Sequence, residues 1–327
     1  MILSSGSGAG HCRGGRRLPC RPSRSGGPRL WYTPGVLYPP WRLLGNNYDL
    51  HTHSSVSDGL LTPAELVAWA ARRGTDVVAL TDHDEVGGLD EALAAAEAAG
   101  IGFVPGVEVS VSWESHTLHV VGLGIDPRAP ALRDGLAEIR AGRLERAARM
   151  AESLARAGIG GTFDAAVALA RNREMVGRTH FARHLVERGY AKDVKSVFKN
   201  YLVKGKPGFS PHAWAALDEA VAWIVTAGGR AVIAHPGRYG LGPNVLARLL
   251  ETFRAAGGTG IEVVTGNHTR DQIRDFARLA VRHGLLASRG SDYHGPGESF
   301  VDPAGLPPLP PECVPVWHDW TAGALQH

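Results

Sequence analysis

Histidine and acidic residues recur along this chain in short motifs, and each motif closes or lies within a β-rich run. His51 and His53 follow the run YDL with one residue between them, and Asp292 and His294 repeat that spacing after GLLASRG. Residues two apart in an extended segment point the same way, so His51 and His53 can share one target. Imidazole and carboxylate groups placed in this way are candidate metal ligands.

The other runs carry further groups of the same two kinds. The complete set of candidate ligands is His51, His53, Asp58, His83, Glu108, His119, His235, Asp292 and His294. Imidazole and carboxylate ligands together suit Zn²⁺, Mn²⁺ or iron and do not indicate a thiolate site. This set is too large for one ion and suits two or three ions that share bridging ligands.

Each motif also has an ordinary interpretation. An isolated HxH is usually two solvated histidines, TDHD can cap a helix, and Glu108 alone could be a surface carboxylate. All of these interpretations would have to hold at once at successive strand ends, so the combined pattern favours a metal site. No role is assigned to the remaining histidines of the body, His116, His184, His212, His283, His318 and His327.

The elements that must position these groups begin at residue 47. Seven β-rich runs alternate mostly with helical stretches, which predicts a parallel α/β barrel or a doubly wound sheet. Thr62 as N-cap, Pro63, Glu65 in a capping box and Gly74 mark the first helix. The carboxyl ends of parallel strands meet on one face, where active sites are built, and six of the seven strands bring a His, Asp or Glu near it.

The alternation stops between residues 127 and 226, which read as an all-helical subdomain able to cover the mouth of the barrel. The predicted plan is a disordered tail rich in Gly, Arg and Pro (1–46), the first part of the barrel (47–126), the helical insertion (127–226), the second part of the barrel (227–300) and a C-terminal extension (301–327) that packs irregularly.

Composition excludes several classes of protein. Of 327 residues, 44% are hydrophobic and 20% charged, which is typical of a soluble globular chain, and no apolar run is long enough to span a bilayer. The first 48 residues hold seven Arg and no acid, so removing their charge from the net +3 leaves −4 on the body. We therefore expect no stable DNA binding. Cys12, Cys20 and Cys313 form no CxxC pair, which favours a cytoplasmic protein.

Together these motifs resemble the PHP family, the polymerase-and-histidinol-phosphatase metallohydrolases. The resemblance runs through YDLHTHSSVSDGLLTPAELV, VVALTDHDEVGG, VPGVEVS, LHVVGLGID, AVIAHPGR, GIEV and GSDYHG, over roughly residues 47 to 300. Within the family the chain is most similar to the bacterial phosphoesterases that resemble 3′,5′-nucleoside bisphosphate phosphatase, which share the helical insertion and a VGRTHFARHLVERG-like helix. The implied fold is a distorted (β/α)7 barrel with an inserted helical subdomain.

The resemblance implies three divalent ions, Mn²⁺ first and Fe²⁺ or Zn²⁺ as alternatives. The implied ligand sets are His51, His53, Glu108 and Asp292 for the first ion, a bridging Glu108 with His119 and His235 for the second, and Asp58, His83 and His294 for the third. Many relatives have histidine in place of Asp58, and aspartate is typical of the subgroup named above. A hydroxide bridging two ions would attack phosphorus, so no catalytic side chain is expected beyond it.

Four further residues are candidates for binding the phosphate of the substrate: Arg178, His180, Arg238 and His268. A guanidinium fork suits phosphate, but Arg178 could instead cap a helix or pair with Glu187, and His268 could lie behind the site.

The resemblance implies hydrolysis of the 3′-phosphate of 3′,5′-nucleoside bisphosphates, or trimming of short RNA from its 5′ end. The alternative enzyme is a histidinol-phosphate phosphatase, which the helical insertion and Asp58 disfavour. An alternative of another class is a nucleotide-sensing, metal-binding module without turnover. We expect no membrane partner and a monomer or simple homo-oligomer.

Overall fold

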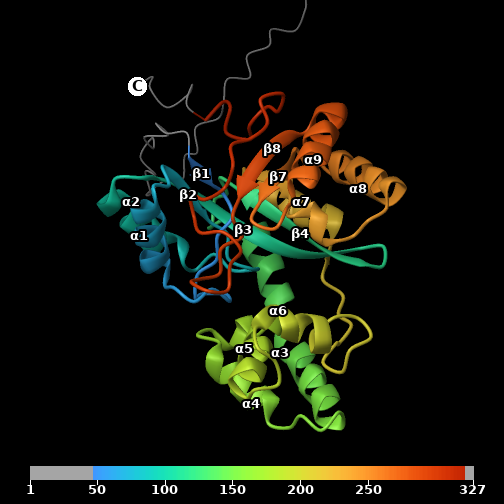
Figure 1. Cartoon of the computed structure of the whole chain (residues 1–327). Coiled ribbons are helices and arrows are strands. Elements are labelled where there is room, and N and C mark those ends of the chain that lie inside the picture. The colour runs from blue at the N-terminus through green and yellow to red at the C-terminus, as the bar shows by residue number, and fades with distance from the viewer. Residues whose placement is uncertain (1–46, 321–327) are drawn as a thin grey trace, which may run out of the picture. The chain divides into compact units, whose positions relative to one another are not determined.

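The computed structural model describes residues 47–320 (Figure 1). The predicted tail, residues 1–46 with Cys12 and Cys20, and His327 lie outside the described residues. The strands are β1 (Tyr48–Asp49), β2 (Val77–Leu80), β3 (Gly102–Trp113), β4 (His116–Leu123), β5 (Ala215–Ala216), β6 (Arg230–Ile233), β7 (Gly260–Thr265) and β8 (Leu286–Gly290). The α-helices are α1 (Pro63–Arg73), α2 (Leu89–Ala99), α3 (Pro130–Arg156), α4 (Thr162–Leu169), α5 (Arg178–Glu187), α6 (Val194–Val197), α7 (Leu217–Thr226), α8 (Pro243–Ala255) and α9 (Arg270–His283).

The strands form one sheet that is nearly closed into a barrel. Its order is β1, β2, β3, β4, β6, β7 and β8, and the short β5 pairs with β3. The backbone N–H of Leu50 donates to the carbonyl of Arg289 at 2.9 Å, and Thr52 bridges Tyr293, so the first and last strands meet. The seven predicted strands and the α/β barrel are confirmed.

The expectation of a wholly parallel sheet was wrong at β4. This strand runs antiparallel to both β3 and β6. The reason is the two-residue turn between Trp113 and His116, which is too short for the crossover that a parallel neighbour requires. The reversal brings the beginning of β4, with His119, to the same face as the carboxyl ends of the parallel strands.

Local sequence signals explain the first helix, α1. The hydroxyl of Thr62 accepts from the backbone N–H of Glu65, and the Glu65 carboxylate accepts from the N–H of Thr62. Gly74 then ends the helix with φ at 90°, a left-handed conformation that glycine adopts without strain. The predicted bounds of this helix are confirmed.

A second apolar cluster forms apart from the barrel core. Its buried residues all lie between Ala147 and Leu202, on α3 to α6, the turns between them and the segment Phe198–Leu202 after α6, and Figure 1 shows these helices gathered together. The first half of α3 packs in the barrel core through Leu132 and Leu136, so this one helix belongs to both clusters.

The predicted insertion, 127–226, extends beyond the C-terminal end of this apolar cluster. It includes β5, a strand where none was expected, and α7, whose Leu217 and Val221 lie in the barrel core. Within residues 47–320, no helix has both the length and the apolar character needed to cross a membrane.

The segment after Val301 is irregular and lies against the barrel. Pro315 bridges Ala287 of β8, and the ring of Trp317 stacks on Tyr48 of β1 with the ring centroids 4.2 Å apart. These contacts cover the edge where the two ends of the sheet meet.

Candidate metal centre

The structure brings all nine candidate ligands together, and Glu108 lies at their centre. Its carboxylate is fully buried on β3 and contacts five histidines. Oε1 lies 2.8 Å from both His119 Nδ1 and His235 Nε2. Oε2 lies 2.9 Å from His83 Nδ1 and 3.3 Å from the Nε2 atoms of His51 and His53. One carboxylate is therefore shared by several groups of ligands, as a bridging ligand would be.

The first ligand set has the spacing that a tetrahedral ion requires. His51 Nε2 and His53 Nε2 are 3.1 Å apart, and Asp292 Oδ1 lies 3.6 and 3.2 Å from them. An ion about 2.0–2.1 Å from four tetrahedral ligands would hold those ligands about 3.4 Å apart. With Glu108, these buried atoms lie within 4.8 Å of one another, a spacing that one ion can span.

A hydrogen bond from the His51 ring to Glu262 fixes which of its two nitrogens faces the other candidate ligands. His51 Nδ1 lies 2.8 Å from Glu262 Oε1, so Nδ1 carries the proton that is donated and Nε2 is the nitrogen that faces the other candidate ligands. Glu108 Oε2 and Asp58 Oδ1 are also buried without a hydrogen bond. Buried carboxylate oxygens without a hydrogen bond are costly, and a divalent cation would compensate them. The residues present thus fit a metal.

The second ligand set depends on an unusual backbone. His235 follows β6 with φ at 29°, and its backbone N–H donates to Glu262 Oε2. A non-glycine residue at positive φ is strained, and such strain collects at functional sites. Asp292 shares the feature, with φ at 57° at the end of β8.

The third ligand set is held from the helical cluster. Asp58 Oδ1 lies 3.3 Å from His294 Nε2 and 3.8 Å from His83 Nε2. Its other oxygen accepts a hydrogen bond of 2.8 Å from the Thr179 hydroxyl on α5. Arg183, one turn further along α5, donates to the backbone carbonyl of Asp58 at 2.6 Å. Helix α5 thus turns one oxygen of Asp58 toward the histidines.

The charged groups of the centre shift one another's pKa values. Burial alone would raise the pKa of Asp58, Glu108 and Asp292, but the surrounding histidines, joined by Arg238 at Asp292, hold all three well below their usual range. Burial opposes protonation of His53, yet its bonds to Asp292 and Glu108 raise its pKa to about 10. The three carboxyl groups are therefore ionised, as carboxylate ligands of a divalent cation must be.

Sequence reasoning missed three buried acids that support the centre. Glu262 on β7 accepts from both His51 and His235. Asp82 accepts from the backbone and hydroxyl of Ser54, and burial raises its pKa to about 6. Asp84 pairs with Arg143 of α3. The signal for Glu262 was present, because it is the single charge in the buried run GIEVV.

The four phosphate-binding candidates have different surroundings. The Arg238 guanidinium pairs with Asp292 while 40% of its side chain stays exposed, so it faces both the ligands and solvent. Arg178 lies over the ring of Phe198 at 5.5 Å and forms no ion pair within residues 47–320.

The two histidines in this group are held by backbone. His180 Nδ1 accepts from the N–H of Gly177, which caps α5, and burial lowers its pKa to about 4. His268 Nδ1 lies 3.0 Å from the Val263 carbonyl and its Nε2 accepts from Gly237. With both ring nitrogens in use, His268 positions the turn after His235, and its geometry does not support the predicted phosphate contact.

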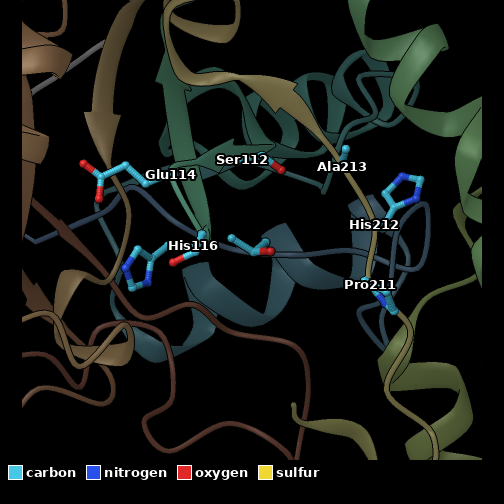
Figure 2. Close-up of a pocket in the computed structure, with 8 residues that line it drawn as sticks. Ser112, Glu114, His116, Pro211, His212 and Ala213 are labelled. Carbon is cyan, nitrogen blue, oxygen red and sulfur yellow. The ribbon is translucent and has the colours of Figure 1, made fainter. Parts of the chain in front are cut away.

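A cavity of about 400 Å³ lies between the β3–β4 hairpin and residues 211–213, away from the nine ligands (Figure 2). Figure 2 shows His116 and His212 on opposite sides of it. The His212 ring meets Trp214 edge-on, with the centroids 4.3 Å apart.

Comparison with known proteins agrees with this geometry. The PHP domain family matches residues 49–265. Over 280 residues the chain is 56% identical to a 3′,5′-nucleoside bisphosphate phosphatase of Chromobacterium violaceum, covering 86% of this chain and 98% of that protein. It is 41% identical to the 5′-3′ exoribonuclease Rnm of Salmonella typhimurium, covering 84% and 93%. An amidohydrolase of Chromobacterium violaceum, solved with sulfate and without metal, superposes with a TM-score of 0.82 at 57% identity, covering 85% and 96%.

Proposed function

Because the chain belongs to the PHP domain family, we propose that it is a metal-dependent phosphoesterase that removes the 3′-phosphate of 3′,5′-nucleoside bisphosphates. The observation that carries this proposal is the buried cluster of nine ligands around Glu108. The relative named for this activity is 56% identical over nearly its whole length, so the substrate class follows from that similarity.

We propose three divalent ions in this centre. His51, His53, Glu108 and Asp292 would hold the first, Glu108, His119 and His235 the second, and Asp58, His83 and His294 the third. Mixed imidazole and carboxylate ligands suit Mn²⁺, and Fe²⁺ or Zn²⁺ are the alternatives. Bound divalent ions supply an activated water near neutral pH and neutralise phosphate oxygens.

The side chains around the ions have separate tasks. Glu262 fixes the tautomer of His51, and α5 orients Asp58 through Thr179. Arg238 lies beside Asp292 with part of its guanidinium exposed, where it would neutralise a phosphate oxygen of the substrate. The proposed hydrolysis therefore needs no nucleophilic side chain. It needs only side chains that hold the ions, orient the ligands and neutralise the phosphate.

Short RNA is a second substrate class, favoured by the similarity to the exoribonuclease Rnm. A histidinol-phosphate phosphatase is less favoured because the similar proteins described above are named for nucleotide substrates. A sensing module without turnover is disfavoured by the complete ligand set. We further propose a cytoplasmic enzyme that is a monomer or a simple homo-oligomer.

The experiment compares, in Mn²⁺, phosphate release from 3′-phosphoadenosine 5′-phosphate, AMP and histidinol phosphate with mononucleotide release from a 5′-phosphorylated short RNA. The blank is the double variant Asp292→Ala, His294→Ala. Release from the bisphosphate, lost in the blank, is the expected result. Release from histidinol phosphate alone would overturn the substrate assignment, and bound metal with no release from any compound would favour the sensing module.

A further inference from the structure

Four arginines follow one another at every third position of α3: Arg140, Arg143, Arg146 and Arg149. Residues three apart on a helix are neighbours, so these side chains form one row. Three of them have acidic partners. Arg140 lies near Glu85, Arg143 pairs with Asp84, and Arg149 pairs with Glu145. The exception is Arg146, which has no ion-pair partner within the described part of the chain.

Arg146 is also buried. Only 8% of it is exposed, and its Nε has no hydrogen-bond partner in residues 47–320. Burial, together with the positive charges of Arg178, Arg143 and Arg149, lowers its pKa to about 9. Asp84, which pairs with Arg143, acts on Arg146 in the opposite direction. A buried guanidinium without an ion-pair partner is costly, and an anion from outside the chain would compensate that cost.

An aromatic ring lies beside this unpaired charge. The guanidinium carbons of Arg143 and Arg146 are 5.0 and 5.1 Å from the centre of the half-buried Trp214 ring. The backbone N–H of Trp214 donates to the Ser112 hydroxyl of β3 at 2.9 Å, which holds this residue against the barrel. A guanidinium over an aromatic face gains a cation–π attraction that uses none of its N–H donors.

One arginine of this row connects α3 to the metal centre. Arg143 pairs with Asp84, the residue next to His83. Arg178 acts electrostatically on Arg146 and is itself influenced by Asp58, Arg143 and Arg238. It forms no ion pair with any residue from 47 to 320. Arg146 and Arg178, neither of which forms an ion pair within residues 47–320, are thus within electrostatic reach of each other, and Asp58 of the third ligand set is within reach of Arg178.

We propose that Arg146 and Arg178 form a second anion subsite, which binds the 5′-phosphate of the substrate while the 3′-phosphate lies at the metal centre. This proposal rests on the proposed function and deepens it, because it explains how a bisphosphate would be distinguished from a 3′-monophosphate. Guanidinium forks bind phosphate through two parallel hydrogen bonds, and Arg146 has its donors free of acidic partners.

The test compares the wild type with Arg146→Gln on adenosine 3′,5′-bisphosphate and adenosine 3′-monophosphate in Mn²⁺. Losing a charge-assisted contact should lower kcat/KM for the bisphosphate about 10- to 100-fold, mainly through KM. Activity on the monophosphate should change little. Arg146→Lys keeps the charge without the fork, so its kcat/KM for the bisphosphate should lie between those of the wild type and Arg146→Gln. Arg133→Gln, an exposed arginine on the same helix, is the matched control and should behave as the wild type.

A binding measurement separates this proposal from the proposed function. AMP keeps the 5′-phosphate, so it should raise the Tm of the wild type and of Arg133→Gln but not that of Arg146→Gln. Without ligand, the Tm of Arg146→Gln should not fall, because an unpaired buried charge is removed. Equal loss of activity on both substrates, or an unchanged effect of AMP on the Tm of Arg146→Gln, would overturn the subsite. If neither substrate is hydrolysed, the proposed function fails, and the Tm shift alone decides on the subsite.

Discussion

At the scale of single residues, the site is organised around carboxylates that the histidines share. Glu108 contacts five of them, and Glu262 supports His51 through its side chain and His235 through its backbone. A support of this kind fixes the tautomer and the ring orientation of a ligand before any ion binds. The affinity of the centre for metal therefore depends on residues that never touch the ion.

Glu262→Gln tests this dependence at one residue. The amide keeps the shape of the carboxylate, but it cannot accept from His51 and from the His235 backbone at once without presenting an N–H to one of them. We expect the affinity for Mn²⁺, measured by titration of metal-stripped protein, to fall about 10- to 100-fold. Excess Mn²⁺ should restore much of the activity.

The control for that variant is Glu114→Gln, at an exposed glutamate in the hairpin turn between β3 and β4. Its Mn²⁺ affinity should match the wild type. Equal affinities in Glu262→Gln and the wild type would show that Glu262 does not support the ligands.

At the scale of elements, the barrel carries the candidate ligands, and α5 positions one of them, Asp58, through hydrogen bonds. Thr179 and Arg183 lie one turn apart on this helix and donate to the side chain and the backbone of Asp58. Arg183 also binds Glu298 through two bonds of 2.8 Å, near His294. The helical cluster is thus joined to the third ligand set by two residues, Thr179 and Arg183.

Thr179→Val tests this connection while keeping the shape of the side chain. Loss of the hydrogen bond to a buried carboxylate should lower kcat/KM about tenfold and weaken metal binding at the third ligand set. Thr179→Ser keeps the hydroxyl and should retain the wild-type values. A valine variant with unchanged metal binding and activity would contradict the role given to α5.

The difference between what the sequence predicted and what it left out follows from distance along the chain. His51 and His53, or Thr62 and Glu65, act within a few residues, so their spacing alone is informative. Thr179 and Asp58 are 121 residues apart, and only the packing of α5 against the barrel brings them together. The unpaired state of Arg146 likewise depends on which acids α3 meets. The direction of β4 was readable from its short turn, but the pattern of alternating elements concealed it.

At the scale of the whole molecule, every group given a role lies between residues 47 and 320. Deletion of residues 1–46 should therefore leave kcat/KM for the bisphosphate unchanged within about twofold. The measurement is phosphate release by the full chain and the shortened chain at equal metal loading. A loss of activity that purified, folded, metal-loaded protein cannot recover would assign the first 46 residues a part in function.

The most direct test of the central claim follows metal and turnover together. Metal-stripped protein is titrated with Mn²⁺ while bound ions and phosphate release from adenosine 3′,5′-bisphosphate are measured in the same samples. We predict no release without metal, and release that rises as the ions bind, with Asp292→Ala, His294→Ala inactive throughout. Full release by the metal-free protein, or saturated metal binding without release, would contradict the claim that the cluster around Glu108 is a phosphoesterase centre.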